Sequence, residues 1–216
     1  MFHVLKSDKV ILDNISFKNK ISTNNNSYNI FMNYLHDNNR KDFVIQTPIL
    51  LCMFGLSSFG NNKYLDLSFV NMDNDEKIRD MRDCINKINK HILKHMRYKH
   101  KKYKSQFVNS LKPNNGIYHE RLRTSISDNI LVFDKYNNKT TLDSIKSRTL
   151  VKALINVSHV WINNDKFGLY YNIVQLKTYG KLILNDYQFI DDDSDKPYVL
   201  EIPELNATAN ILNAPQ

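Results

Sequence analysis

One segment of this sequence has the apolar spacing of a long α-helix. Its apolar residues recur at intervals of three and four, which places them along one stripe of a helix surface. Asp73 stands three residues before Glu76, the spacing of a capping box at a helix start. The pattern predicts a helix from about residue 74 to residue 98. The stripe consists of Ile78, Met81, Ile85, Ile88, Ile92 and Met96.

The segments on either side of this helix have the composition of β-strands. They are rich in β-branched and aromatic residues and are bounded by Asn, Asp or Gly. Asn-rich turns are expected at 24–26, 60–62 and 137–138, and a short helical turn near 140–146. Many short strands with one long helix, without strand–helix alternation, favour a mainly β, mainly antiparallel fold that closes or half closes into a barrel. The expected strands cover about residues 8–17, 28–36, 44–54, 63–70, 117–126, 129–136, 149–163, 167–179 and 181–190.

The charges are divided unevenly along the chain, which carries a net charge of +8. Residues 1–190 hold 29 basic and 16 acidic residues, a net charge of +13, whereas residues 191–216 hold one basic and six acidic residues, a net charge of −5. A basic body indicates a polyanionic partner, and an acidic end can imitate that polyanion. We expect one nucleic-acid-binding domain over 1–190 and a flexible acidic tail over 191–216. A basic surface that only keeps the protein soluble is the alternative.

The densest cationic stretch is KHILKHMRYKHKKYK, residues 90–104. It holds seven Lys and Arg residues and no acidic residue, with Tyr98 and Tyr103 interleaved. Lys and Arg neutralise phosphates, and Tyr rings stack on unpaired bases. Arg121 and Arg123 follow on one face of an expected strand, because alternate residues of a strand share a face. The stretch favours a nucleic-acid surface, and a solvated basic helix end is the alternative.

Two long strands joined by a four-residue turn are expected over residues 149–180. Strict alternation places Trp161 on the same face as the apolar residues of the first strand, which predicts a core position for its ring. Gly168 in the second strand can allow a bulge or a close approach of another backbone. Tyr170 and Tyr171 point to opposite faces, so one of the two rings is expected to be accessible for stacking.

No set of residues has the spacing of a catalytic or metal site. A Gly-rich phosphate loop, a nucleophile elbow and a zinc-type Cys/His cluster are all missing. His91 and His95 have the i, i+4 spacing of metal ligands without a third ligand, and Asp191–Asp193 fit a solvated acidic run. We therefore expect no enzymatic activity, no bound metal and no cofactor. Cys52 and Cys84 fit reduced, buried thiols, and the N-terminus lacks a signal-peptide pattern.

Three stretches resemble the OB-fold single-stranded DNA-binding proteins of nucleocytoplasmic large DNA viruses, which are distantly akin to phage-type single-strand binders. The resemblance covers about residues 47–180 and is most specific in the last of the three stretches. Tyr170-Tyr171 departs from the small residue and Trp of the family pattern, and the final Gln216 departs from an aromatic end. The stretches are TPILLCMFGLSS (47–58), KYLDLSFVNMDND (63–75) and VKALINVSHVWINNDKFGLYYNIVQLK (151–177).

This resemblance implies an OB-like barrel that coats single-stranded DNA in viral replication, recombination or packaging. It places family aromatics at Phe167 and Tyr171. Together with the cationic stretch, it predicts as nucleic-acid-binding residues Lys94, Arg97, Tyr98, Lys99, Lys101, Lys102, Tyr103, Lys104, Arg121, Arg123, Phe167 and Tyr171.

The expected partner is single-stranded DNA, or RNA, bound without regard to sequence. The acidic tail is expected either to bind replication proteins or to fold back over the basic groove when nucleic acid is absent. We also expect oligomers to form on DNA, and no membrane contact. The expected location is the viral factory of the host cytoplasm, or the virion, rather than secretion. The alternative function is a non-enzymatic viral structural or interaction protein that binds an acidic protein partner.

Overall fold

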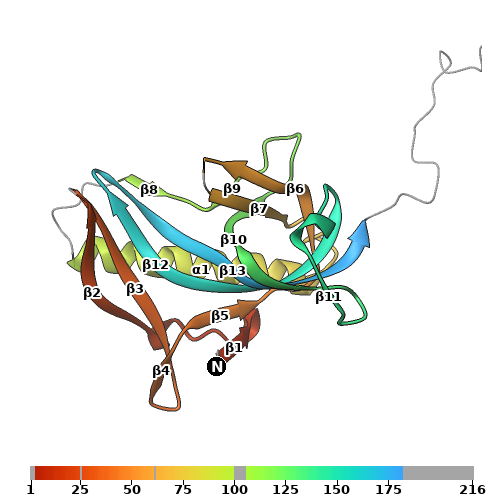
Figure 1. Ribbon diagram of the computed structural model, residues 1–216. Helices are drawn as coiled ribbons and strands as arrows, with labels where there is room; N and C mark the ends of the chain where they lie inside the picture. The colour runs from red at the N-terminus through yellow and green to blue at the C-terminus, as the bar shows by residue number, and fades with distance from the viewer. Residues whose placement is uncertain (1–2, 25, 61, 100–105, 182–216) are drawn as a thin grey trace, which may run out of the picture. The chain divides into compact units, whose positions relative to one another are not determined.

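The computed structural model describes residues 3–24, 26–60, 62–99 and 106–181, which form a mainly β structure with one long helix (Figure 1). The strands are β1 (His3–Lys6), β2 (Ile15–Asn24), β3 (Ser27–His36), β4 (Asn39–Lys41), β5 (Phe43–Gln46), β6 (Leu50–Phe59), β7 (Asn62–Ser68), β8 (Gln106–Val108), β9 (Leu111–Lys112), β10 (Arg121–Phe133), β11 (Lys139–Thr140), β12 (Thr149–Asn163) and β13 (Lys166–Lys181). The helix is α1 (Glu76–Lys99), and 3₁₀ turns are η1 (Ser7–Lys9), η2 (Leu12–Asn14) and η3 (Leu142–Ser144). The predicted mainly β class with one long helix is confirmed.

Five strands pair in a circuit that returns to its starting strand. β6 pairs with β7, β7 with β10, β10 with β13, β13 with β12, and β12 again with β6. Four of these pairings are antiparallel, but β10 and β13 run parallel. Two pairings beyond the circuit, β1 with β5 and β13 with β8, are also parallel, so the predicted antiparallel pattern holds only for most of the strands.

Additional strands extend the sheet from β12. β3 pairs with the last part of β12 and carries β2 and β4 on its own edges. The β12–β13 hairpin therefore has partners along most of its length, with β3 beside β12 and β8 beside β13 near the hairpin turn. Side chains of neighbouring strands that face the same way consequently form a continuous row across β3, β12 and β13.

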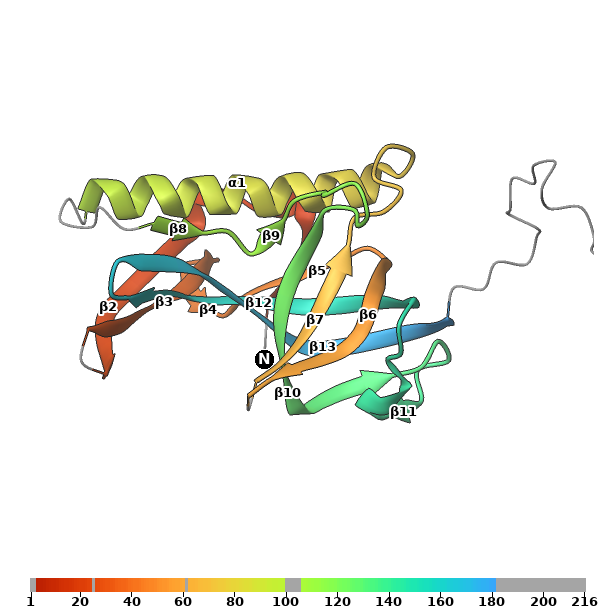
Figure 2. The ribbon, with the colours of Figure 1, turned by 90° about the horizontal axis from the view of Figure 1, so that it is seen from above.

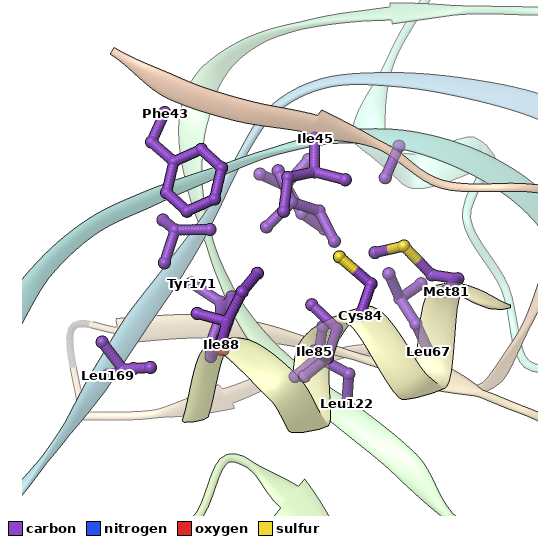
Figure 3. Packing of buried hydrophobic residues seen from close by; sticks show 14 of the residues in the cluster. Phe43, Ile45, Leu67, Met81, Cys84, Ile85, Ile88, Leu122, Leu169 and Tyr171 are labelled. Carbon is purple, nitrogen blue, oxygen red and sulfur yellow. The ribbon is translucent and has the colours of Figure 1, made fainter. Parts of the chain in front are cut away.

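α1 lies along one side of the strands and buries its predicted apolar stripe against them (Figure 2). Ile85, Ile88 and Ile92 are fully buried, and the close view shows Ile85 and Ile88 beside Leu122 and Tyr171 (Figure 3). Burying a side chain of this size contributes about 1.5–3 kcal/mol before the loss of conformational entropy. The apolar contacts of α1 thus belong to the same core as the inward faces of the strand circuit.

The helix begins two residues later than predicted, at Glu76. Asp75, rather than Asp73, accepts hydrogen bonds at its Oδ1 from the backbone N–H groups of Lys77 (2.9 Å) and Ile78 (3.3 Å). Asp75 therefore satisfies two N–H groups of the first turn, which no helical carbonyl can reach.

The segment predicted as a strand over 8–17 is instead folded into the turns η1 and η2, and β2 starts only at Ile15. The backbone N–H of Ile11 donates to the buried hydroxyl of Tyr34 at 2.9 Å, which replaces the partner that a neighbouring strand would supply. The runs VIQ and LLCMF of the predicted segment 44–54 form two strands, β5 and β6, with Pro48 between them, because proline has no N–H to donate to a ladder. The two strands predicted at 117–126 and 129–136 form the single strand β10.

Asparagine supplies the left-handed backbone of the predicted turns. Asn26, Asn137 and Asn164 have positive φ angles of 69°, 70° and 49°, in a region that asparagine tolerates better than most residues. η3 corresponds to the helical turn predicted near 140–146.

Both cysteines are buried free thiols, as predicted. Burial raises the pKa of Cys52 to about 11 and that of Cys84 to about 12, so both remain protonated at neutral pH. The predicted division into a domain over 1–190 and an acidic tail stays a prediction, because residues 182–216 lie outside the described part of the chain.

Candidate nucleic-acid interface

A bulge in β12 turns Trp161 out of the core. Val157 pairs with Tyr171 and His159 pairs with Tyr170, so Ser158 is an extra residue without a partner on β13. One extra residue reverses the inward–outward alternation of every residue that follows it. The predicted core position of Trp161 is therefore wrong: Val160 and Ile162 are buried, and Trp161 is half-buried on the outer face.

Three planar rings follow one another across three neighbouring strands of that outer face. Phe31 of β3 lies opposite His159 of β12, with ring centroids 5.2 Å apart. His159 lies opposite Tyr170 of β13, with centroids 4.7 Å apart and ring planes 22° from parallel. All three rings are half-buried, so each presents part of its surface to solvent.

Two more aromatic residues continue this set beside Tyr170. Trp161 and Tyr64 line the same hollow as Tyr170, Tyr64 coming from β7 on the far side of β10. We call the five aromatic residues Phe31, His159, Tyr170, Trp161 and Tyr64 the ring row. It reaches over the five neighbouring strands β3, β12, β13, β10 and β7, a span of about 19 Å at the usual spacing of strands.

Gly168 allows the indole of Trp161 to lie close against β13. A Cβ atom at Gly168 would stand 2.7 Å from Cζ2 of Trp161 and 2.7 Å from the carbonyl oxygen of Val108 on β8. Both distances are shorter than real Cβ contacts, so any side chain here would displace the indole, β8, or both. The sequence-based expectation of a close backbone approach at this glycine is confirmed.

Two hollows on the outer face join at Tyr170 and Ser125, which line both of them. The first has a volume of about 310 Å³ and the second about 240 Å³. We call the two together the outer groove. The first hollow is lined by Tyr64, Val108, Asn109, Ser110, Lys112, Arg123, Thr124, Ser125, Trp161, Leu169, Tyr170 and Tyr171, and the second by Asn62, Lys63, Ser125, Ile126, Ser127, Tyr170 and Asn172.

The outer groove has cationic walls and, among the described residues, no carboxylate in its lining. Lys112 and Arg123 line the first hollow and Lys63 lines the second. Such walls attract a polyanion. Salt lowers the affinity in proportion to the number of phosphate charges that the walls neutralise.

Asp66 holds the side chains of Arg121 and Arg123 on β10 in place. Its carboxylate is 3% exposed and accepts two hydrogen bonds from Arg123, each 2.9 Å long, and one from Nε of Arg121 at 3.3 Å. These bonds to Asp66 raise the pKa of Arg123 above its usual value. Two guanidinium groups against one carboxylate leave a positive charge, and the Arg123 side chain remains 47% exposed.

His159 is neutral at physiological pH. Burial lowers its pKa from 6.5 to about 4, because the charged imidazolium loses solvation between its ring neighbours. Its Nδ1 lies 2.6 Å from the hydroxyl of Ser158, the bulge residue. The ring therefore acts as an uncharged aromatic surface and not as a phosphate-binding cation.

A family model described as "Family of unknown function (DUF5871)" matches residues 66–191, which is more than half of the chain. The chain belongs to this family. The matched DUF5871 region contains His159, Trp161 and Tyr170 of the ring row and the groove cations Lys112 and Arg123.

Solved structures similar to this DUF5871 protein include single-stranded DNA-binding proteins of bacteriophages. The T7 protein gp2.5 is 11% identical, with a TM-score of 0.49, over 69% of this chain and 98% of that chain. The bacteriophage Enc34 protein in complex with single-stranded DNA is 11% identical, with a TM-score of 0.41, over 77% of this chain and 97% of that chain. No curated protein matches the chain. The predicted kinship to large DNA viruses stays a prediction.

The structure corrects two aromatic residues of the predicted site. Phe167 is 3% and Tyr171 2% exposed, so neither ring can stack on a base without leaving the core. The hydroxyl of Tyr171 instead donates a 2.8 Å hydrogen bond to Oδ1 of Asn89 on α1. Both residues occupy inward positions of β13, and Tyr170 is the accessible member of the tyrosine pair.

The predicted cations do not form one groove in the described part of the chain. Arg123 lines the outer groove and Arg121 stands beside it, whereas Lys94, Arg97 and Tyr98 lie on the outward face of α1. Arg82 of α1 binds Glu120, the neighbour of Arg121, and Lys94 is twelve residues further along the helix. That separation is about 18 Å at 1.5 Å per residue.

Five further predicted residues cannot be placed. Lys101, Lys102, Tyr103 and Lys104 lie outside the described residues, as does the side chain of Lys99. Their predicted contacts with nucleic acid stay predictions.

Sequence reasoning missed most of the ring row. Phe31, Tyr64 and His159 lie on three different strands, and only strand register brings them together. One usable signal was the tyrosine pair 170–171, since two adjacent aromatic residues in a strand must face opposite sides.

Two further features are missing from the described part of the chain. No helix there is long and apolar enough to cross a membrane. Within the same residues, no three His, Cys, Asp or Glu side chains are grouped so that they could hold a metal ion.

Proposed function

We propose that this protein binds single-stranded DNA without reading its sequence, through the ring row and the outer groove. The observation that carries the proposal is the ring row. Phe31 is tilted against His159, His159 stacks on Tyr170, and Trp161 and Tyr64 follow in the adjacent hollow. Unpaired bases present a flat face whatever their identity, so a set of half-exposed rings suits them without selecting letters.

The cations of the groove suit the phosphates of the same strand. Arg123, Lys112 and Lys63 stand along the hollows that the rings line, so a strand whose bases stack on the rings has its phosphates near positive charge. A duplex could not use the rings, because its bases are already stacked on one another. Rings and cations in one groove therefore favour a single strand.

The circuit of five strands supports an OB-like barrel as the frame of this groove. In our proposal, β6, β7, β10, β13 and β12 form the barrel, and the ring row crosses its outer surface from β12 to β7. An OB fold is a five-stranded, partly open barrel that binds oligonucleotides on one face.

The wider role follows from the sequence resemblance alone. We propose a role in viral DNA replication, recombination or packaging, in the viral factory or the virion. The alternative is an interaction protein that binds an acidic protein partner. It explains the cations but not the ring row.

A fluorescence titration with oligothymidine tests the proposal directly, since Trp161 is the only tryptophan in the sequence. Stacking of a thymine in the first hollow should quench its emission. The affinity should fall as salt rises, with a logarithmic slope of about −2 if the three groove cations each neutralise one phosphate at about −0.7. Titration without any salt-dependent change in emission or anisotropy would exclude the proposal.

A further inference from the structure

The second half of α1 carries a strip of cations that the outer groove does not use. Between Cys84 and Lys99 the helix has no acidic residue, although its first turns contain Glu76, Asp80 and Asp83. Four cations of this half are exposed and fall within an arc of about 80° at 100° per residue, opposite the buried stripe. We call these four the helix strip: Lys87, Lys90, Lys94 and Arg97.

The helix strip forms no ion pair in the described part of the chain, although Lys87 at its start lines a hollow with Asp8, Asp80 and Asp83. The ion pairs of α1 there belong to Arg82, which binds Asp83 and Glu120 near the other end of the helix. None of the four cations of the strip forms an ion pair with a described residue. The hollow lined by Lys90, Lys94 and Arg97 contains no described carboxylate, so the charges of these three are available to a ligand.

Helix stability does not explain the strip. The helix dipole favours cations only in the last turn, which includes Arg97 but neither Lys87 nor Lys90. Cations three and four residues apart repel one another and destabilise a helix. Lys90 and Lys94 are such a pair, and Arg97 stands three residues after Lys94, so a polyanion would relieve a repulsion that the fold leaves in place.

The helix strip is separate from the outer groove and has a different chemistry. Lys90, Lys94 and Arg97 line a hollow of about 450 Å³ with Leu93 and Tyr98, and no residue of this hollow lines the outer groove. Among the strip and its hollow, Tyr98 is the single aromatic residue. A straight row of cations with one ring suits a ligand that offers phosphates and hides its bases.

We propose that the helix strip is a second nucleic-acid site, which binds the phosphate backbone of double-stranded DNA. A duplex presents evenly spaced phosphates and no free base faces, which matches four cations spaced three or four residues apart along about 15 Å of rigid helix. This goes beyond the proposed function, because the protein then contacts duplex and single strand through different surfaces.

The test compares two triple variants of the full chain on two probes. Lys90→Gln/Lys94→Gln/Arg97→Gln removes three charges of the strip, and Lys135→Gln/Lys139→Gln/Lys146→Gln removes three exposed lysine charges elsewhere. The probes are a blunt DNA duplex and an oligothymidine of about eight nucleotides, within the ~4–16 nucleotides that such folds cover.

We expect the strip variant to bind the duplex at least tenfold more weakly than the control variant, with the logarithmic salt slope reduced by about two to three. Its affinity for oligothymidine should stay within about threefold of the control. Equal losses in both variants would overturn the inference, as would equal losses on both probes or a wild-type protein that does not bind the duplex. The oligothymidine measurement on wild-type protein tests the outer groove separately, so failure of one site is distinguishable from failure of the other.

Discussion

At the scale of single residues, the indole of Trp161 packs directly against the backbone of Gly168. The Cβ of any other residue at position 168 would stand 2.7 Å from the indole and 2.7 Å from the backbone of β8. A residue with no side chain is therefore part of the binding surface, because it sets the position of the ring that a base would meet.

Replacing Gly168 by alanine should move Trp161 and loosen β8. Overpacking of this kind costs about 1–3 kcal/mol of unfolding free energy. The expected result is a lower urea midpoint, a shifted Trp161 emission maximum and weaker binding of oligothymidine. In a Trp161→Ala background the same substitution should cost less, since one of its two clashes is gone. Wild-type stability and emission in Gly168→Ala would show that the indole does not lie against β13.

His159 should make stability depend on pH in a defined window. Its folded pKa of about 4 lies below the ordinary value of 6.5, so between these values the unfolded chain binds more protons than the folded chain. The free energy of unfolding should therefore fall as pH is lowered from about 6.5 towards 4. His159→Phe keeps a ring in the row without the titration, so urea midpoints at pH 7 and pH 5 should differ less in the variant than in the wild type. Parallel losses in both proteins would contradict the assignment.

The inward or outward direction of individual rings was the least predictable feature. Simple alternation put Trp161 in the core, but the bulge at Ser158 reversed the order three residues earlier, and no local sequence signal marks that bulge. Tyr171 was predicted at the surface and is buried because α1 offers its hydroxyl the side chain of Asn89. That acceptor is 82 residues away in the sequence, so only the folded structure brings the two together.

At the scale of elements, Asn89 joins three parts of the fold. Its Oδ1 accepts the hydroxyl of Tyr171 on β13, and its Nδ2 donates to Oδ1 of Asn109 at 3.0 Å, between β8 and β9. Asn109 also accepts the backbone N–H of Leu111. One buried amide of α1 thereby fixes the segment that forms a wall of the first hollow.

Asn89→Ala should destabilise the protein by about 1–3 kcal/mol, because it leaves the buried Tyr171 hydroxyl without an acceptor. Urea unfolding measures the loss of stability. The control is Asn86→Ala, because Asn86 is half-buried and lies three residues before Asn89 on the same helix. Adding Tyr171→Phe to Asn89→Ala should recover part of the stability, since the unpaired hydroxyl is then absent. If both single alanine variants lose the same stability, the amide does not hold these elements together.

Elements with strong periodicity were predictable, and elements defined by distant partners were not. α1 and β12 were predicted almost to the residue, because an apolar stripe of helical spacing and an alternating strand are properties of a continuous segment. The turns η1 and η2 replaced a predicted strand because Tyr34 satisfies the N–H of Ile11. The short strands β8 and β9 are defined by their pairings with β13 and β10. Two or three residues carry too little pattern for the sequence to predict such strands.

At the scale of the whole molecule, the described residues present two cationic surfaces of different composition. The outer groove combines Arg123, Lys112 and Lys63 with the ring row, whereas the helix strip combines cations with a single ring. The sequence predicted one cationic, ring-bearing surface. Strand pairing and the length of α1 separate it into two, and only the groove has the rings that unpaired bases need.

The most direct test of this division is the affinity of Tyr170→Ala for oligothymidine, measured by anisotropy beside Tyr136→Ala. Tyr170 belongs to the ring row, whereas Tyr136 is 71% exposed on the turn between β10 and β11. Loss of one stacked base costs about 1–3 kcal/mol, so Tyr170→Ala should bind about 5- to 150-fold more weakly while Tyr136→Ala binds like the wild type. A folded Tyr170→Ala protein with wild-type affinity would contradict the claim that the ring row binds the strand.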